Sequence, residues 1–277
     1  HAVTANNMWQ GVKDRAEIVG ITNAIHLPTW VDSRIVRAAK NPSSEIWRLH
    51  QENKKQLLRN IYERTGVRLK QDALLIGFSR RAVPYKRSDF IFSDRSKVDG
   101  LFKSGKLQIV FSGKAHPLDD GGKQIVANIV ALTKKYPRSV VFLENYDMNI
   151  GAMLVRGSDV WLNNPRRPQE ASGTSGMKAA MNGVLNLSIL DGWWPEACQH
   201  GVNGWQIGDG YENKSEKKLD AHDQKALYKV LLNEVLPTYY DDKKQWVEMM
   251  KQSVLTTSKP FAVKRMLQEY YDKLYIA

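Results

Sequence analysis

The sequence predicts an α/β protein built on a doubly wound parallel sheet with flanking helices. From residue 72 onward, short β-rich runs alternate with helix-like segments, which is the order that a parallel sheet with crossover helices requires. Several of these runs are continuously apolar, as expected for strands covered on both faces. The length of 277 residues and the apolar share of 42% suit one large domain, or one domain with a helical appendage.

The elements of the sheet region follow from its apolar runs. The candidate strands are residues 74–78, 107–111, 140–143, 159–162, 185–189 and 205–207. The helix-like segments between them are residues 88–103, 121–136, 147–157 and 175–183. Ligands of such sheets lie at the carboxyl ends of the strands, so the residues after each strand are the first candidates for function.

The flanking segments differ in clarity. Residues 1–40 show no clear period, but a strong helix signal follows, with Asn41 as cap, Pro42 at the first helical position and Gly66 as the stop. Its apolar stripe is formed by Ile46, Leu49, Leu57, Leu58, Ile61 and Tyr62. After a predicted surface loop at 209–221, helices are expected at 223–236 (ended by Pro237), at 241–254, and at 261–274 after Pro260. The expected division is a joining segment with its helix (1–70), the sheet domain (71–258) and a C-terminal helix (259–277).

Composition excludes several classes of function. The net charge of +12 suggests an anionic partner, but Lys and Arg are scattered and no nucleic-acid recognition motif is present, so no nucleic acid is expected. No apolar run approaches the roughly 20 residues of a membrane helix, so no membrane contact is expected. The single cysteine, Cys198, excludes an internal disulfide framework and fits a reducing, cytoplasmic compartment. No metal is predicted, because no His/Cys/Asp set has ligand spacing, and no G-x-S-x-G elbow supports a serine hydrolase.

The loop after the fourth candidate strand carries the strongest chemical signal. It contains Glu170-Ala171-Ser172-Gly173-Thr174-Ser175-Gly176-Met177-Lys178. A strand, a Gly/Ser/Thr loop and a helix start form an anion cradle, because backbone N–H groups, hydroxyls and the helix dipole all favour negative charge. Lys178 is expected in the first turn of that helix, where an amine beside a phosphate cradle suits pyridoxal phosphate. On spacing alone, a tight turn with an exposed lysine is an equal alternative; a Walker A loop is not matched.

The same segment resembles a known family. Residues 170–183, EASGTSGMKAAMNG, resemble the pyridoxal-phosphate lysine motif of the α-glucan (glycogen, starch and maltodextrin) phosphorylases, in the form of the shorter bacterial and archaeal branch. Further matches occur in family order from about residue 20 to 210. They are residues 21–30 (joining segment), Gln51-Glu52-Asn53-Lys54, residues 77–87 (basic segment GFSRRAVPYKR), residues 112–117 (the G-K-A-x-P turn) and residues 142–146 (FLENY).

The resemblance implies a fold and a reaction. It implies the Rossmann-like C-terminal lobe of a GT-B glycosyltransferase, in which residues 71–258 bind cofactor and phosphate. The reaction would transfer the terminal glucosyl unit of an α-1,4-glucan to inorganic phosphate, giving α-glucose 1-phosphate. The phosphate group of pyridoxal 5′-phosphate would perform the acid–base work. A homodimer is common in the family.

The resemblance also implies roles for individual residues. Lys178 would hold pyridoxal phosphate covalently as a Schiff base, and Arg81 and Lys86 would bind the substrate phosphate as the catalytic pair. The other implied cofactor-binding residues are Thr174, Ser175, Gly176, Tyr146 and Arg80. The implied substrate-binding residues are Glu170, Ser172, Gly173, Asn23 and Tyr85. Cations are needed because two phosphates in one closed site repel each other; without the resemblance, Arg80-Arg81 would be interpreted as a solvated pair.

Some features weaken or limit these expectations. Pro84 is unusual in the basic segment, and the sequence leaves open whether it moves Tyr85 and Lys86 away from the substrate phosphate. Trp193-Trp194 could stack on sugar, but packing is the favoured interpretation, and His116 could line the site or have no role. Nothing in the chain resembles the family's N-terminal lobe, and the first residue is His1 rather than Met, which suggests a fragment, a processed chain or a trimmed one. We therefore expect this chain alone to bind cofactor poorly and to be nearly inactive.

Two other functions remain open from the sequence. A nucleotide-sugar-dependent GT-B glucan synthase would use Arg81 and Lys86 for a diphosphate but would not need an amine at Lys178. A non-catalytic lobe that binds glucan or assembles with a partner would need neither.

Overall fold

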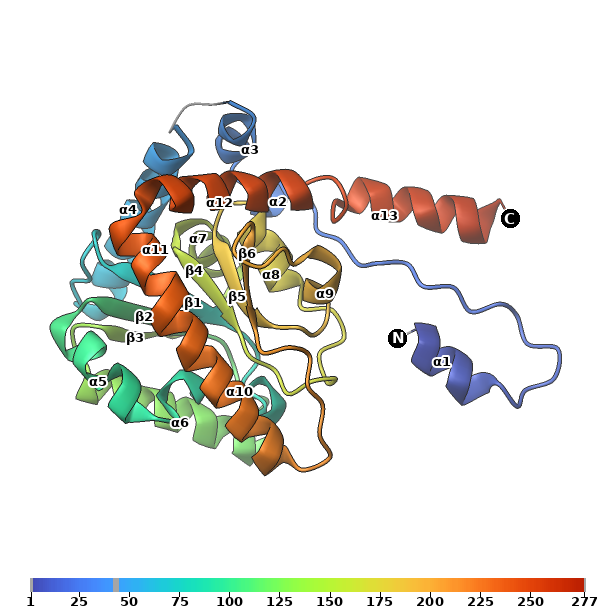
Figure 1. Ribbon diagram of the computed structural model, residues 1–277, viewed down its shortest axis with the longest axis horizontal. Helices are drawn as coiled ribbons and strands as arrows, with labels where there is room; N and C mark the ends of the chain where they lie inside the picture. The colour runs from blue at the N-terminus through green and yellow to red at the C-terminus, as the bar shows by residue number, and fades with distance from the viewer. Residues whose placement is uncertain (1, 42–44, 277) are drawn as a thin grey trace.

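The computed structural model describes residues 2–41 and 45–276. Its centre is one parallel six-stranded sheet of order β3-β2-β1-β4-β5-β6 (Figure 1). The strands are β1 (Leu74–Ser79), β2 (Leu107–Ser112), β3 (Val140–Leu143), β4 (Val160–Asn163), β5 (Leu185–Ile189) and β6 (Gly204–Ile207). The predicted doubly wound Rossmann-like sheet is confirmed. Its order reverses between β1 and β4, which is where such sheets form ligand crevices.

Alternate residues of strands β1 to β4 pack into two different cores. Leu74, Ile76 and Phe78 of β1 face one cluster together with α5 (Arg95–Ser104) and α6 (Asp120–Lys135). Leu75 faces the other cluster, together with α7 (Met148–Gly157) and the later turns of α4 (Glu45–Thr65). Both faces of the sheet are therefore covered, which explains why the strands are continuously apolar.

Several predicted boundaries differ from the structure, and three of these differences concern where helices begin or end. The predicted helix at 88–103 is broken into a 3₁₀ turn, η2 (Phe90–Phe92), and α5, because the carboxylate of Asp94 accepts from the Ser96 N–H and starts a new helix. The predicted loop at 209–221 ends early, since α10 (Glu216–Val230) already begins at Glu216. Pro237 does not end a helix. It stands in α11 (Leu236–Asp241), which continues directly from α10 through the π-helical turn η3 (Leu231–Val235).

The segments at the two ends of the chain lie side by side. Helices α1 (Ala2–Trp9), α2 (Leu27–Trp30) and α3 (Ser33–Ala39) precede α4, whose predicted start at Pro42 lies outside the described residues. Ile25 bridges the chain between α12 (Lys243–Thr257) and α13 (Val263–Tyr270): its N–H donates to Phe261, and its carbonyl accepts from Val263. Helices α1 and α13 project from the body of the molecule (Figure 1). α13 continues into the π-helical turn η4 (Tyr271–Tyr275).

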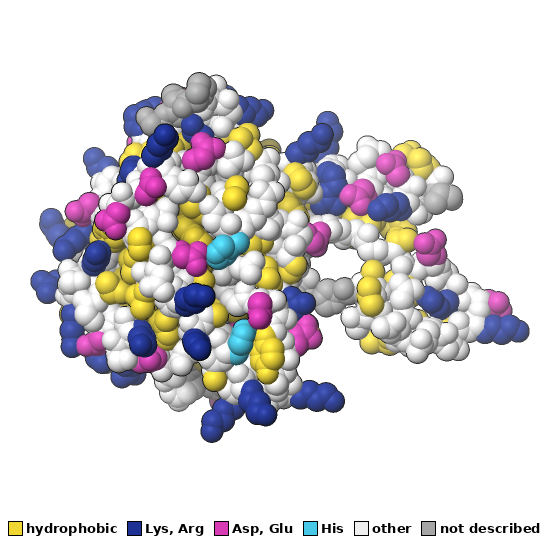
Figure 2. Space-filling view, viewed as in Figure 1, with side chains coloured by type: hydrophobic (Ala, Val, Ile, Leu, Met, Phe, Trp, Pro, Cys, Tyr) yellow, Lys and Arg dark blue, Asp and Glu magenta, His cyan; other side chains and the backbone are white. Residues whose placement is uncertain are grey.

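Two surface properties bear on function. Lys and Arg side chains are spread over the face seen in Figure 2 and do not gather into one stripe. Within the described residues, no helix combines the length and the apolar character needed to cross a bilayer.

Candidate functional site

A cleft of about 710 Å³ lies at the carboxyl ends of the strands around the reversal point of the sheet. Its walls are the loops that follow β1, β2, β3 and β4, together with α8 (Thr174–Ala180). All of the sequence-predicted site residues except Gly176 and Asn23 line it. The topology thus collects segments that are nearly 100 residues apart in the sequence, as expected for the strand ends of a parallel sheet.

The lining of this cleft is strongly cationic. Five basic side chains contribute to it, and Glu170 is its one carboxylate; the basic residues are Arg80, Arg81, Lys86, Lys114 and Lys178. Arg81 and Lys114 are exposed and form no ion pair within the described part of the chain. Positive charge therefore exceeds negative charge in a concave, partly water-excluded space, and such a space attracts anions.

Glu170 balances two of these cations. Its Oε2 atom lies 2.7 Å from Nη2 of Arg80 and 3.1 Å from Nζ of Lys86. The side chains of Arg80 and Glu170 are only 5% and 9% exposed. The second terminal nitrogen of Arg80, Nη1, is buried and has no hydrogen-bond partner. A buried guanidinium N–H without a partner is costly, so this atom is suited to receive an anionic oxygen from a ligand.

The turn that carries Lys86 directs the basic side chains of this segment to two different sides: Lys86 faces the cleft and Arg87 faces away from it. Pro84 begins the 3₁₀ turn η1 (Pro84–Lys86), in which the Lys86 N–H donates to Val83. Lys86 is buried and stays on the cleft side, with Nζ 5.0 Å from the ring centre of Tyr85. With Pro84 in this turn, both Tyr85 and Lys86 line the cleft.

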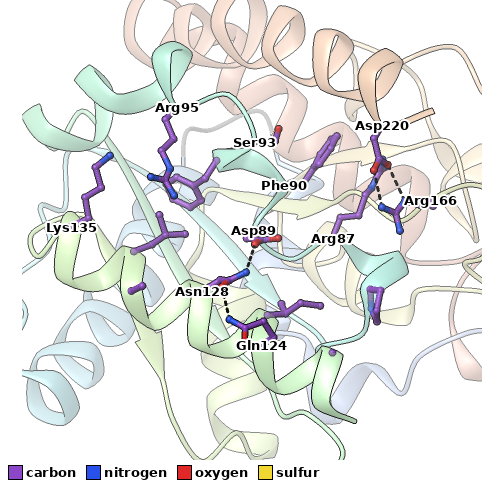
Figure 3. A pocket seen from close by; sticks show the side chains of 16 residues that line it. Arg87, Asp89, Phe90, Ser93, Arg95, Gln124, Asn128, Lys135, Arg166 and Asp220 are labelled. Carbon is purple, nitrogen blue, oxygen red and sulfur yellow. Dashed lines mark hydrogen bonds and ion pairs between the residues drawn. The ribbon is translucent and has the colours of Figure 1, made fainter. Parts of the chain in front are cut away.

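Arg87 points to the other side of this turn. Its backbone is left-handed (φ 48°), and its side chain donates to the carbonyls of Asn164 and Pro165 and to the carboxylate of Asp223. There it lies beside a separate groove of about 740 Å³, together with Arg166 and Asp220 (Figure 3). Arg87 therefore holds the loop after β4 by hydrogen bonds to its carbonyl groups, whereas Lys86 faces the cleft.

Lys178 lies in the second turn of α8, not in the first turn as predicted, because the helix already begins at Thr174. Its Nζ atom lies 3.3 Å from the ring centre of Trp30, and it has no carboxylate partner among the described residues. Half-burial lowers the pKa of Lys178 from its ordinary value, since burial disfavours the charged ammonium. The side chain lines the cleft, so the alternative of an exposed lysine on a tight turn is wrong.

The start of α8 is packed closely onto the sheet. Gly173 caps it in a left-handed conformation (φ 77°), and Thr174 and Ser175 form its first positions. The hydroxyl of Ser175 accepts from Nε1 of Trp161 at 3.2 Å, which leaves its own proton free for another acceptor. Gly176 lies beneath them, where a Cβ atom would come within 2.7 Å of both Asn186 and Trp193. Gly176 thus acts through close packing and not as part of the lining.

Tyr146 closes the cleft from the loop between β3 and α7. Burial raises the pKa of its phenol. A Cβ atom at Gly151 would come within 2.6 Å of the phenolic oxygen, so the ring rests directly against α7. A neutral phenol in this place can donate a hydrogen bond to a ligand in the cleft.

A second cavity of about 460 Å³ adjoins the first and shares Glu170, Ala171 and Ser172 with it. Asn23 lines this cavity and not the cleft; it is exposed, and its amide oxygen accepts from the Ala24 N–H. The lining includes the carboxylates of Glu170, Asp191 and Glu196, several hydroxyls and the amide of Asn23, and among the described residues it has no Lys, Arg or His. Carboxylates and amides are acceptors and donors for sugar hydroxyls, so the two cavities have opposite chemical characters.

Several residues near the site were not assigned from the sequence. Trp30 contacts Lys178, Lys114 lines the cleft and Asp191 lines the second cavity. Trp30 and Lys114 belong to quoted motifs, and the charge of Lys114 was the available signal for it. His116 lines the cleft, and its Nδ1 atom accepts from the Leu118 N–H. Trp193 and Trp194 are 2% and 0% exposed, which confirms the packing interpretation. Within the described residues, no group of three or more His, Cys, Asp or Glu could hold a metal.

Comparison with known proteins gives one consistent result. The family model described as carbohydrate phosphorylase matches residues 34–200. The maltodextrin phosphorylase of Thermococcus litoralis is 37% identical over 97% of this chain, and the glycogen phosphorylase of Aquifex aeolicus is 36% identical over 99% of it. The glycogen phosphorylase of Mycobacterium tuberculosis is 33% identical over 98% of the chain. The chain spans only 37%, 46% and 36% of the lengths of these three relatives.

Proposed function

The chain belongs to the carbohydrate phosphorylase family, and on that premise we propose that it is the C-terminal half of an α-1,4-glucan phosphorylase. The proposed reaction transfers a terminal glucosyl unit from glucan to inorganic phosphate and releases α-glucose 1-phosphate. The observation that carries the proposal is the pair of adjoining cavities that meet at Glu170, one cationic and one lined by carboxylates, hydroxyls and the amide of Asn23. A reaction between an anion and a neutral sugar needs two such spaces in contact.

In this proposal, the cationic cleft takes the phosphate. Arg81 and Lys86 hold it, the first with a planar guanidinium and the second with a point charge. At an effective dielectric of about 20, one unit charge 4 Å from another contributes roughly 4 kcal/mol. Arg81, exposed and without an ion pair within the described residues, has its charge available for the ligand.

The second cavity takes the transferred sugar. Glu170 and Ser172 lie at the junction, and we assign them, with Gly173 and Asn23, to the sugar hydroxyls. Ion pairs with Arg80 and Lys86 hold the carboxylate of Glu170, so its orientation is set before the sugar binds. Tyr85, beside Lys86, is assigned to the substrate at the same junction.

We further propose pyridoxal 5′-phosphate as the cofactor, covalently held by Lys178. The fit rests on three features: a half-buried amine with a lowered pKa, the free hydroxyl protons of Thr174 and Ser175 at the start of α8, and the partnerless Nη1 atom of Arg80. When bound, this cofactor supplies a second phosphate group that can exchange a proton with the substrate phosphate. Arg80 would neutralise the paired phosphates, Gly176 would let α8 pack closely enough to present its N–H groups, and Tyr146 would donate a hydrogen bond to the cofactor.

The test uses the full-length protein that contains this chain. We expect glucose 1-phosphate to be released from maltodextrin only when phosphate is present. Incubation with pyridoxal phosphate, borohydride reduction and peptide mapping should place the label on Lys178. Lys178→Ala should abolish both, whereas the matched surface variant Lys217→Ala should change neither. Glucan extension from a nucleotide sugar without a label on Lys178 would favour a synthase, and glucan binding without turnover would favour a non-catalytic lobe.

We place the protein in the cytoplasm as part of this proposal. Its single cysteine is consistent with a reducing compartment, and two of the relatives are named glycogen phosphorylases. Fractionation of cells that produce the protein, with activity assayed in each fraction, tests this assignment.

A further inference from the structure

The turn after β5 contacts the segment that joins the two cavities. We propose that Asp191 is a positioning residue for Glu170, and this inference rests on the function proposed above. One carboxylate oxygen of Asp191, Oδ2, accepts from the backbone N–H of Glu170 at 2.9 Å. The other, Oδ1, accepts from the backbone N–H of Gly192 at 2.9 Å. Asp191 therefore ties the loop after β4 to the turn after β5.

A second connection runs parallel to the first. The backbone N–H of Trp193 donates to the carbonyl of Ser172 at 2.9 Å. Gly192 lies between the two hydrogen bonds with φ 61°, and a Cβ atom there would lie 2.5 Å from the Ser172 carbonyl oxygen. The two segments are therefore in direct backbone contact, and a side chain larger than hydrogen does not fit between them.

The turn itself is held rigidly. The ring of Trp193 is buried and stands edge-on to Phe261, with ring centres 5.0 Å apart. The carboxylate of Asp191 is partly buried, and its desolvation raises its pKa, while the hydrogen bonds from the Glu170 and Gly192 N–H groups and the charge of Arg167 act in the opposite direction. Each of its oxygens accepts one backbone N–H, so the carboxylate holds the Glu170 backbone and the Gly192 backbone at the same time.

This arrangement determines what Asp191 controls. Glu170 lies at the junction of the cavities, where its side chain balances Arg80 and Lys86. If its backbone were released, the carboxylate would follow the two cations and lose its orientation toward the second cavity. Arg81, which belongs to the loop after β1, would keep its place in the anion cleft. Asp191 thus controls sugar binding more than phosphate binding.

The experiment compares Asp191→Asn with Asp242→Asn in the full-length protein. In Asp191→Asn, the amide nitrogen replaces one of the two accepting oxygens, so one of the two backbone N–H groups loses its acceptor. Asp242 is the matched control: its carboxylate accepts from the Gln245 N–H at 2.9 Å, and it lines neither cavity. We expect the KM for glucan to rise about tenfold in Asp191→Asn, because one lost hydrogen bond of about 1.4 kcal/mol corresponds to a factor of ten. The KM for phosphate should change less than about threefold. Asp242→Asn should alter neither constant.

Amide hydrogen exchange gives a readout that does not depend on activity. The Glu170 amide should exchange faster in Asp191→Asn than in the wild type or in Asp242→Asn. An unchanged glucan KM, or equal rises in both KM values, overturns the proposal. If the wild-type protein releases no glucose 1-phosphate, the proposed function fails. The exchange rate of the Glu170 amide still tests whether Asp191 holds that amide in a hydrogen bond. Should Asp191→Asn not fold, Asp191→Ser, whose hydroxyl can still accept one N–H, is expected to raise the glucan KM in the same direction.

Discussion

At the scale of single residues, the environment decides which members of a common residue type are chemically distinct. Lys178 differs from a solvated lysine because Trp30 lies against its ammonium group and the cleft partly excludes water. Arg80 differs from its neighbour Arg81 because its guanidinium is buried against Glu170, whereas Arg81 is exposed in the cleft. Neither distinction depends on the residue type alone.

The lowered pKa of Lys178 has a direct consequence for its reactivity. Only the neutral amine is a nucleophile, and burial shifts the equilibrium toward it at lower pH. In competitive labelling with trace acetic anhydride, Lys178 should reach half of its maximal reactivity at a lower pH than the lysine of a short unstructured peptide. Quantification by mass spectrometry checks this, and a midpoint equal to or above that of the peptide would contradict it.

Gly113 is required by the backbone at the cleft. Its φ is 149°, and a Cβ atom would lie 2.1 Å from the carbonyl oxygen of Arg80. Gly113→Ala should therefore lower the free energy of unfolding by about 1–3 kcal/mol. Gly100→Ala is the matched control, since nothing lies within 4 Å of its added Cβ in the middle of α5, and it should be neutral or stabilising by about 0.5–1 kcal/mol. Urea denaturation measures both; equal effects would refute the steric argument.

At the scale of elements, a buried ion pair joins α4 to the sheet. Nζ of Lys54 lies 2.5 Å from Asp159 and also donates to the carbonyl of Ala73 and to the hydroxyl of Tyr239 on α11. Both partners of the pair are fully buried. Burial alone would raise the pKa of Asp159, but the charge of Lys54 and the hydrogen bond from His50 lower it below its ordinary value. Lys54 on α4 thus contacts the residue before β1 and the hydroxyl of Tyr239 on α11.

Removing that lysine should damage the fold more than removing an exposed one. Lys54→Met leaves the carboxylate of Asp159 buried without its cation, and we expect a loss of about 3–5 kcal/mol in the free energy of unfolding. Arg48→Met, on the exposed side of the same helix, should lose about 1 kcal/mol or less, because its pairs with Glu45 and Glu52 are solvated. Chemical denaturation of both variants provides the measurement. A loss from Lys54→Met as small as that from Arg48→Met would show that the buried pair contributes little.

At the scale of the whole molecule, part of the excess positive charge is concentrated in the cleft. The net charge is +12, and the cleft concentrates five basic side chains against one carboxylate. Ligands that bind only the folded state stabilise it, by about 2.7 kcal/mol at 100 times their dissociation constant. Inorganic phosphate should therefore raise the Tm more than chloride does at equal ionic strength. Arg81→Ala should reduce this difference and Arg59→Ala, on the solvated face of α4, should not; a phosphate effect unchanged by Arg81→Ala would place the anion elsewhere.

Activity is also expected to depend on the whole molecule, including the part of the relatives that this chain does not span. The relatives are more than twice as long as this chain, and the resemblance implies that their N-terminal lobe completes the cleft. We expect the 277-residue chain alone to release glucose 1-phosphate at a negligible rate, and addition of the separately produced N-terminal lobe to restore activity. A rate near that of the full-length protein without the added lobe would contradict this expectation.

The sequence alone determined the class of fold, the order of its strands along the chain and the family. These follow from local signals: continuous apolar runs for strands covered on both faces, and a long motif from Glu170 to Gly183 that tolerates few alternatives. The helix breaks were less predictable, because the cap at Asp94 and the continuation of the helix through Pro237 depend on hydrogen bonds and packing that the local pattern does not contain.

Only the tertiary structure decided how the site is assembled. It brought Arg80, Lys86 and Glu170 into one ion cluster, turned Arg87 away from it, and placed Trp30 against Lys178. It also tied Asp191 to the backbone of Glu170. The physical reason is that these contacts join residues far apart in the sequence. Their distances depend on where a parallel sheet brings its strand ends together, and no local pattern of residues encodes that meeting point.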